Sequence, residues 1–452
     1  MRNSKIETTG SDRLSRRGFL GGAASTVAAF TIVPRHVLGG PGHTPPSDKL
    51  NVAGIGVGGK GAGDIGGCSE ENIVALCDVD EKQAGKTFEK YPKARKFKDF
   101  RRMLEKMEKQ IDAVTVATPD HVHAPAAMMA IKMKKHVYVE KPLTHSVYEA
   151  RMLTQAARKY GVATQMGNQG HSSEGARLIC EWIWDGAIGH VRQVHAWTDR
   201  PGGRWPQGVG RPEKIDKVPS TLAWDFWLGP APWRPYNKVY VPFKWRGWWD
   251  FGTGALGDMG CHIIDPAFWA LKLTAPTSVE AISTPVNDET APVVSKVDYE
   301  FPARGDMPPV KLSWYDGELR PTNPEVLEPG RRMGSDNGGT LFVGDKGMLV
   351  CGCYGKSPRL IPETKMKEYN RPSKSIPRVE GHHQDWLQAC KGGTPPCSNF
   401  DYAGPLTETV LLGNVAIRTG RMIYWDPQNM KITNIPEANK YLRREYRSGW
   451  EI

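Results

Sequence analysis

The sequence predicts an α/β protein of two domains, a doubly wound parallel sheet followed by an α+β domain with a mostly antiparallel open sheet. Short apolar strands alternate with helices over residues 48–170, which is typical of a parallel sheet. Beyond residue 170 the alternation ends, and strand candidates follow one another across long loops. In addition, 452 residues are too many for one ordinary core.

Each element follows from the local pattern of apolar residues. In the first domain we expect strands at 50–55, 73–78, 111–117, 136–139 and 162–166, and helices at 81–90, 99–109, after 123 and at 146–160. In the second domain (171–430) we expect helices at 177–184 and 403–419, and strands at 191–198, 293–301, 310–314, 340–343 and 347–351. A Trp-, Pro- and Gly-rich region (200–253), a Pro- and Gly-rich stretch expected as loop (302–337) and a basic tail (431–452) complete the chain.

A glycine-rich loop lies between the first strand and the first helix and indicates a dinucleotide site. It reads G-x-G-x-x-G, with candidate cofactor contacts at Gly56, Gly58, Gly59 and Gly61. The register that starts at Gly54 also fits, but we choose Gly56 because it follows the last apolar residue of the strand. Asp78 ends the second strand, 22 residues after Gly56. A carboxylate there accepts hydrogen bonds from the adenosine ribose and repels a 2′-phosphate, which favours NAD over NADP.

Two further strands end in residues that we assign to the same site, because ligands of open parallel sheets bind at the carboxyl ends of the strands. Thr118 and Pro119 follow one strand, with His123 shortly after them. Glu140 and Lys141 follow another, and the proline after them stops the strand and turns the chain. Lys141 is therefore expected beside the cofactor.

A second group of candidate catalytic residues lies at 258–265. Asp258 and His262 are four residues apart, so on a helix they share one face. We expect the carboxylate to orient the imidazole and to make His262 a general base. Oxidation of a secondary alcohol needs such a base for the hydroxyl proton and an acceptor for the hydride. Lys141 would hydrogen-bond the same oxygen, and Asp265 would bind a neighbouring hydroxyl.

Two other interpretations of this group stay open. His262 is equally an ordinary buried helix histidine. Asp258, His262 and Asp265 also have spacings that suit Zn or Mn, with His382 or His383 folding close. We expect no metal.

Aromatic and amide side chains indicate a carbohydrate substrate. Eleven of the fifteen tryptophans lie between residues 182 and 269, and flat apolar faces suit sugar rings. Trp248 is the first candidate for stacking. Asn168 and Gln169 are candidates for hydroxyl recognition.

In this order, the motifs resemble those of the Gfo/Idh/MocA oxidoreductases, the family of glucose–fructose oxidoreductase and inositol dehydrogenase. The resemblance covers nearly all of the chain after residue 48. It implies an NAD-binding Rossmann domain, catalysis by Lys141 with the Asp258 and His262 pair, a cis bond before Pro142, and a homodimer or homotetramer. Gly167-Asn168-Gln169 departs from the arginine-containing stretch of many family members.

Residues 1–40 resemble a bacterial twin-arginine signal, with Arg16 and Arg17 ahead of a weakly apolar run, and 41–47 are a linker. The resemblance implies export of the folded protein to the periplasm, with no stable membrane insertion after signal removal. A helical N-terminal arm is the alternative. The net charge of +11 falls to about +7 without residues 1–40 and forms no basic block, so nucleic-acid binding is not expected. The eight cysteines form no disulfide framework, although Cys390 and Cys397 could bridge.

The expected function is therefore an exported NAD-dependent oxidoreductase acting on a secondary hydroxyl of a sugar or glycoside, C3 of a hexoside first. Because a periplasm supplies no free NAD, the cofactor should stay bound and be reset by a second carbonyl substrate. One alternative is an NAD-dependent glycosidase acting by oxidation, elimination and reduction, which needs a second base such as Tyr236 or Tyr240. The other is a non-catalytic sugar-binding protein.

Overall fold

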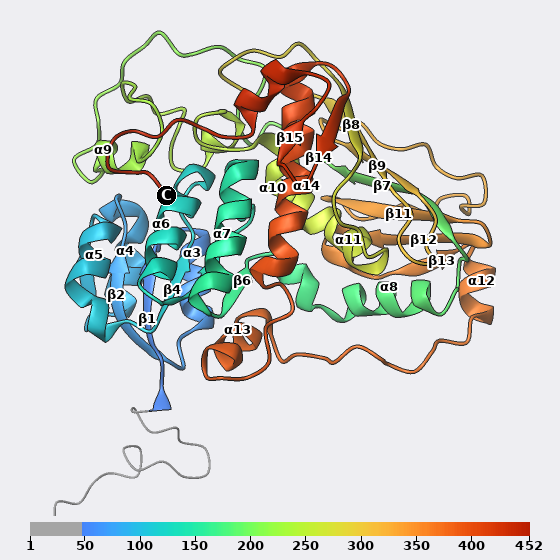
Figure 1. Ribbon diagram of the computed structural model, residues 1–452, viewed down its shortest axis with the longest axis horizontal. Helices are drawn as coiled ribbons and strands as arrows, with labels where there is room; N and C mark the ends of the chain where they lie inside the picture. Colours follow the sequence, from blue (N-terminus) through green and yellow to red (C-terminus); the bar gives the residue numbers. More distant parts are fainter. Residues whose placement is uncertain (1–47) are drawn as a thin grey trace, which may run out of the picture. The chain divides into compact units, whose positions relative to one another are not determined.

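A computed structural model describes residues 48–452, so the predicted signal segment (1–40) and linker (41–47) lie outside the described residues. Residues 50–452 contain two sheets, one built from the first third of the chain and one from the remainder (Figure 1). This confirms the predicted α/β fold class.

The first sheet has six parallel strands in the order β3-β2-β1-β4-β5-β6. Its strands are β1 (Asn51–Ile55), β2 (Asn72–Cys77), β3 (Arg95–Phe97), β4 (Ala113–Val116), β5 (His136–Val139) and β6 (Thr164–Met166). The helices between them are α3 (Lys60–Gly67), α4 (Glu81–Lys90), α5 (Phe100–Met107), α6 (Asp120–Lys132) and α7 (Val147–Tyr160). The order reverses direction at β1, so the carboxyl ends of β1 and β4 flank the point where such sheets bind ligands.

Local signals set the limits of these helices. Ser146 caps α7 by accepting a hydrogen bond from the backbone of Glu149, whose carboxylate in turn accepts from the backbone of Ser146. Gly161 ends the helix in a left-handed conformation. The helix expected at 146–160 therefore begins one residue later, because Ser146 is its cap.

The second sheet has nine strands in the order β13-β12-β11-β7-β10-β9-β8-β14-β15, and only β7 and β10 pair in parallel. Its strands are β7 (Val191–Thr198), β8 (Ser278–Ser283), β9 (Ser295–Phe301), β10 (Val310–Tyr315), β11 (Gly338–Gly344), β12 (Gly347–Gly352), β13 (Arg359–Ile361), β14 (Ile423–Asp426) and β15 (Lys431–Ile432). The sequence did not predict β8, β13, β14 or β15. The strand expected at 310–314 is β10, so the stretch 302–337, also expected as loop, is not all loop.

Seven further α-helices follow in the described part of the chain: α8 (Glu174–Trp184), α9 (Trp224–Leu228), α10 (Gly254–Ile263), α11 (Asp265–Ala270), α12 (Glu363–Glu368), α13 (His382–Cys390) and α14 (Phe400–Thr419). The long helix α14 packs against α7 of the first domain and against α10 and β8 of the second (Figure 1). Trp386 of α13 is buried in the core of the first domain. A segment near residue 386 therefore packs in the first domain although it follows the second sheet in the chain. The domain boundary at residue 170 stays a prediction.

The Trp-rich region 200–253 and the C-terminal tail both reach the first domain. Ala223 N donates to Val79 O at 2.8 Å, and Glu81 N donates to Thr221 O at 3.0 Å. In the tail, Trp450 packs edge-on against Phe100 of α5. Within residues 48–452, no helix combines the length and apolar character needed to cross a membrane.

Candidate active site

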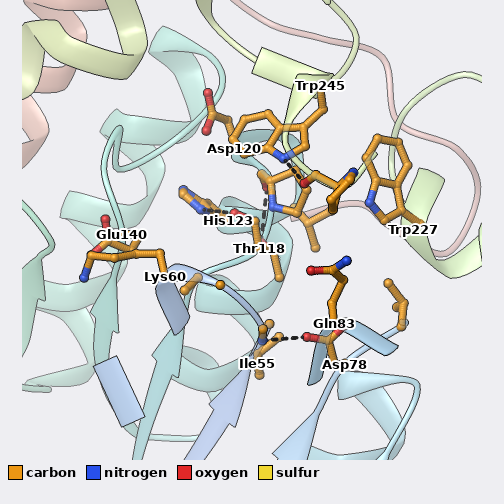
Figure 2. Close-up of a pocket in the computed structure, with 18 of the residues that line it drawn as sticks. Ile55, Lys60, Asp78, Gln83, Thr118, Asp120, His123, Glu140, Trp227 and Trp245 are labelled. Atoms are coloured by element: carbon orange, nitrogen blue, oxygen red, sulfur yellow. Dashed lines mark hydrogen bonds and ion pairs between the residues drawn. The ribbon is translucent and has the colours of Figure 1, made fainter. Parts of the chain in front are cut away.

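A cavity of about 400 Å³ opens at the carboxyl ends of β1, β2, β4 and β5 and extends to α10 (Figure 2). Figure 2 shows Asp78 and Gln83 on one side of it and Trp227 and Trp245 on another. Twelve of the sixteen predicted site residues line this cavity: Gly56, Gly58, Gly59, Asp78, Thr118, Pro119, His123, Glu140, Lys141, Gln169, Asp258 and His262. The other four, Gly61, Asn168, Trp248 and Asp265, do not.

The glycine loop leaves no room for a side chain at Gly56, Gly58 or Gly61. Gly56 has φ of 73°, and its N–H donates to Cys77 O at 2.8 Å. A Cβ on Gly61 would lie 1.8 Å from Gly56 O, so the start of α3 packs directly on the turn. This contact supports the register that begins at Gly56. The bare backbone and the cavity beside it fit a dinucleotide pyrophosphate.

Asp78 is joined to this loop by hydrogen bonds. Its Oδ2 accepts from Val57 N at 2.9 Å and from Gly58 N at 3.0 Å, and its Oδ1 accepts from Asp80 N at 2.9 Å. Burial raises the pKa of Asp78, while these three amides act in the opposite direction. The carboxylate therefore fixes the conformation of the glycine loop. It also lies where the sequence analysis expects the adenosine ribose.

An ion-pair cluster that the sequence did not predict lies at the start of α3. Lys60 Nζ lies 2.9 Å from Glu140 Oε1 and also pairs with Asp64. Gln169 Nε2 donates to the same Glu140 oxygen at 2.7 Å. Burial alone would lower the pKa of Lys60, but Glu140 and Asp64 raise it. Lys60 is thus held as a cation beside the glycine loop (Figure 2).

His123 joins two strand ends. One ring nitrogen lies 2.8 Å from Pro142 O and the other 2.8 Å from Thr118 O. Because both nitrogens have backbone partners, the ring fixes the turns after β4 and β5 in place. The bond between Lys141 and Pro142 is cis, as the resemblance implied.

The Asp258 carboxylate binds cations, and this corrects the predicted pairing with His262. Lys141 Nζ donates to Asp258 Oδ1 at 2.9 Å, and Arg246 Nε donates to the same oxygen at 3.0 Å. Arg200 Nε lies 3.9 Å from Oδ2. Burial would raise the pKa of Asp258, but Lys141 and Arg246 outweigh it and hold that pKa well below its usual range. Asp258 therefore positions Lys141 rather than the imidazole.

His262 lies on the same helix and faces the cavity. Its Nδ1 is buried and has no hydrogen-bond partner among residues 48–452. Its ring centroid lies 4.5 Å from that of Tyr354 in an edge-on arrangement. Burial, and then the charge of Lys141, hold the pKa of His262 well below its ordinary value. The imidazole is therefore neutral near pH 7.

Three predicted substrate residues lie away from the cavity. Trp248 is 1% exposed and packs edge-on against Tyr240 within the Trp-rich region. Asp265 is 2% exposed and accepts hydrogen bonds from Tyr402 Oη at 2.7 Å and from His171 at 2.9 Å. Asn168 is fully buried, with its oxygen bonded to Ser398. None of the three is free to contact a sugar.

Instead, the cavity is lined by other aromatic and basic residues, several of them close in sequence to Trp248. Phe226, Trp227, Phe243, Trp245 and Trp450 supply the rings, and Arg200, Arg246 and Tyr354 lie near Asp258 and His262. Apart from Trp450 and Tyr354, all belong to the region 200–253. Tyr236 and Tyr240, the bases named for the elimination route, do not line the cavity.

The alternative metal set is not assembled. Asp258 is bonded to Lys141 and Arg246, Asp265 to His171 and Tyr402. His382 Nε2 lies 2.7 Å from Met166 O. No group of three or more His, Cys, Asp or Glu side chains in the described part of the chain is arranged to hold a metal ion. Cys390 and Cys397 are free thiols, as are the other six cysteines.

Comparison with known proteins gives two family matches. Residues 50–168 match the Gfo/Idh/MocA model described as "Oxidoreductase family, NAD-binding Rossmann fold". Residues 203–306 match the companion model described as "Oxidoreductase family, C-terminal alpha/beta domain".

Curated relatives include sugar dehydrogenases, and solved structures share the fold. Levoglucosan dehydrogenase of Pseudarthrobacter phenanthrenivorans is 24% identical over 37% of this chain and 35% of its own length. D-glucoside 3-dehydrogenase of Escherichia coli is 26% identical over 47% of this chain and 50% of its own length. The matches thus span half or less of these relatives. The WlbA dehydrogenase of Bordetella pertussis, solved with NADH and UDP-GlcNAcA, has the same fold (TM-score 0.59, 18% identity, 84% of this chain and 99% of that chain). With its glycine loop, its cis-proline turn and both family matches, the chain belongs to the Gfo/Idh/MocA oxidoreductase family.

Proposed function

We propose that the protein is an exported oxidoreductase that uses NAD to oxidise or reduce a secondary hydroxyl of a sugar or glycoside, C3 of a hexoside first. The observation that carries this proposal is that Lys141 and His262 line the same cavity as the glycine loop and Asp78. The relatives named for levoglucosan and for the 3-position of glucosides support the substrate class. The aromatic lining of the cavity suits a sugar ring.

The residues divide the chemistry between them. The loop from Gly56 to Gly61 and Asp78 would hold the dinucleotide, which supplies the hydride acceptor when bound. His262, held neutral, takes the proton of the substrate hydroxyl. Lys141 donates a hydrogen bond to the same oxygen and stabilises the charge that develops there. Asp258 fixes the direction of Lys141.

The cofactor is proposed to stay bound between turnovers. The backbone of 221–223 pairs with that of 79–81 directly after Asp78, and Trp450 of the tail lines the same cavity. These segments cover the end of the cavity where the ribose is expected. A second carbonyl substrate would then return the cofactor to its starting state, giving ping-pong kinetics. Export to the periplasm through Arg16 and Arg17 and assembly as a homodimer or homotetramer belong to the same proposal.

The test is to purify the protein, denature it and assay the released NAD(H), then to screen glycosides for carbonyl formation. Lys141→Ala and His262→Ala should each lower turnover by about 10²–10⁴-fold, the usual contribution of a general acid or base, and should retain the dinucleotide. Lys132→Ala, on the exposed side of α6, is the matched control and should behave as wild type.

Two results would contradict the proposal. One is purified protein that neither contains nor binds NAD. The other is loss of cofactor with retained sugar chemistry in the Lys141 or His262 variant. Release of an aglycone without net change in NAD would instead identify a glycosidase.

A further inference from the structure

A second cavity, of about 410 Å³, lies where the C-terminal tail meets α14 and the loop that precedes α10. Arg418 of α14 and Arg444 of the tail line it, together with Trp249, Thr253 and Asn414. It is separate from the cofactor cavity, although Thr253 Oγ1 donates to Asp120 Oδ2 on the other side at 2.6 Å. The two cavities therefore share a wall.

Arg418 has a guanidinium that no carboxylate of the described residues reaches at hydrogen-bond or ion-pair distance, although the charges of Asp288 and Asp250 act on it. It lies between two rings, 4.2 Å from the Tyr441 centroid and 5.3 Å from the Trp249 centroid. Among residues 48–452 it makes no hydrogen bond or ion pair through its side chain, while burial lowers its pKa. By contrast, Arg151 on nearby α7 forms a two-pronged pair with Glu408 at 2.7 Å. Arg418 is thus a positioned cation with open hydrogen-bond capacity.

Arg444 also has no carboxylate at hydrogen-bond distance within the described residues, although the charges of Glu149 and Asp250 act on it. Its Nε is buried and has no partner within the described residues, and its NH1 reaches only His145 Nδ1 at 3.4 Å. The neighbouring Glu149 is used by the backbone of His145 and Ser146 and by Tyr446. A partly buried guanidinium with a buried, unbonded Nε is costly unless a hydrogen-bond acceptor pairs with it.

The acidic residues of this cavity do not supply that partner. Asp250 is bonded to Arg234. Asp288 and Glu445 are exposed and form no ion pair with Arg418 or Arg444 in the part of the chain that the structure describes. Lys440 and Arg443 add two further cations to the rim.

We propose that this second cavity binds a small oxyanion, the phosphate or carboxylate group of a metabolite, through Arg418 and Arg444. A guanidinium offers two parallel donors that match both groups. Asn414 and Thr253 line the cavity beside them, and Trp249 and Tyr441 give it apolar sides. The inference does not depend on the reaction proposed above.

The experiment titrates the NAD-saturated protein with inorganic phosphate and, separately, with malonate, at constant ionic strength set by chloride. Saturating the protein with NAD keeps the anion out of the pyrophosphate region. Calorimetry should show one saturable site for wild type. Arg418→Met and Arg444→Met should each weaken binding at least tenfold. Arg421→Met removes the same charge from an exposed position near the end of α14 and should leave binding unchanged.

A second readout separates binding from folding. In chloride buffer Arg418→Met should melt at or above the temperature of wild type, because it removes an unpaired, largely buried charge. Phosphate should then raise the melting temperature of wild type and not of the variant. Arg418→Lys keeps the charge but loses the paired donors of the guanidinium, so the variant should fold and should bind the anion weakly.

The relative strength of phosphate and malonate identifies the group that the cavity prefers. Absence of saturable binding of both anions to wild type would overturn the proposal, as would equal binding to all three methionine variants. Equal destabilisation of Arg418→Met in both buffers would show that the arginine serves only to pack against the two rings.

Discussion

Lys141 is held twice by one residue, because its Nζ lies 2.9 Å from Asp258 Oδ1 and 2.6 Å from the carbonyl oxygen of Asp258. The carboxylate is shared with Arg246, which comes from the Trp-rich region. A strand end of the first domain and a helix of the second thus meet through one ion pair. Both domains are needed to place the lysine.

Asp258→Asn should lower kcat by about 100-fold, within the range for a disturbed acid–base group. The amide keeps the shape but loses the charge that directs Lys141, while the bound dinucleotide should be unchanged. Steady-state kinetics and the NAD content after denaturation measure the two effects. Asp225→Asn, at an exposed carboxylate of the same Trp-rich region, is the control. Wild-type kcat in the Asp258 variant would remove this residue from the mechanism.

In the pH profile of the proposed sugar oxidation, protonation of His262 should cause no loss of activity at pH 7. Burial and Lys141 place the pKa of His262 well below its ordinary value of 6.5. The neutral base therefore persists below pH 6.5, and the acidic limb of kcat/KM should fall below that point. A limb at or above pH 6.5 would show that His262 is protonated more easily than its surroundings imply.

The same shift predicts a direction for stability. Below pH 6.5 the unfolded chain binds a proton at this histidine that the folded chain does not, so the free energy of unfolding should fall as the pH is lowered. Urea unfolding of wild type and of His262→Gln at pH 7.5 and 5.5 measures it. The decrease should be smaller in the variant, and an equal decrease would contradict the assignment.

Two glycines of α3 should respond in opposite ways to alanine. In Gly61→Ala the new Cβ would lie 1.8 Å from Gly56 O, so the turn must shift and NAD binding should be lost. In Gly63→Ala the Cβ meets nothing within 4 Å, and the helix should gain roughly 0.5–1 kcal/mol. NAD titration and thermal unfolding distinguish them. Normal NAD affinity in Gly61→Ala would show that the loop does not bind the dinucleotide as we describe.

The C-terminal tail should slow the release of the cofactor. Trp450 is 6% exposed, lines the cavity and lies 4.1 Å from the guanidinium carbon of Arg101. Trp450→Ala should speed NAD release about fivefold, since such an aromatic contact contributes roughly 1 kcal/mol. Dilution of the loaded protein into NAD-free buffer, followed by nucleotide fluorescence, measures the rate. Trp233→Ala, at a tryptophan that is 68% exposed, should leave it unchanged.

The part of the site nearest the first sheet could be predicted because it depends on local patterns. Gly56, Asp78 and Lys141 each follow a strand, and parallel strands bring their carboxyl ends to one edge. Glu140 was placed correctly for the same reason. Its pairing with Lys60 was not predicted, because it depends on which way α3 turns its side chains.

The substrate end could not be predicted in the same way. Trp245 lines the cavity while Trp248, three residues later, does not, because the 3-10 turn at Lys244–Gly247 ends before Trp248, whose backbone is extended. No periodic pattern reveals such a turn. Asp265 turns to His171 and Tyr402, which are 94 and 137 residues away in the chain. Pairings over such distances are decided by tertiary packing.

The backbone bonds from Ala223 to Val79 and from Glu81 to Thr221 also bear on how the protein must be handled. In the retention proposed above, release of a nucleotide at this end of the cavity requires the Trp-rich region to separate from the end of β2. When the nucleotide is retained through purification, the metabolic state of the producing cells, rather than the assay buffer, decides whether a preparation carries NAD or NADH. A reaction mixture without added NAD would then not be a negative control, because the protein would bring its own nucleotide.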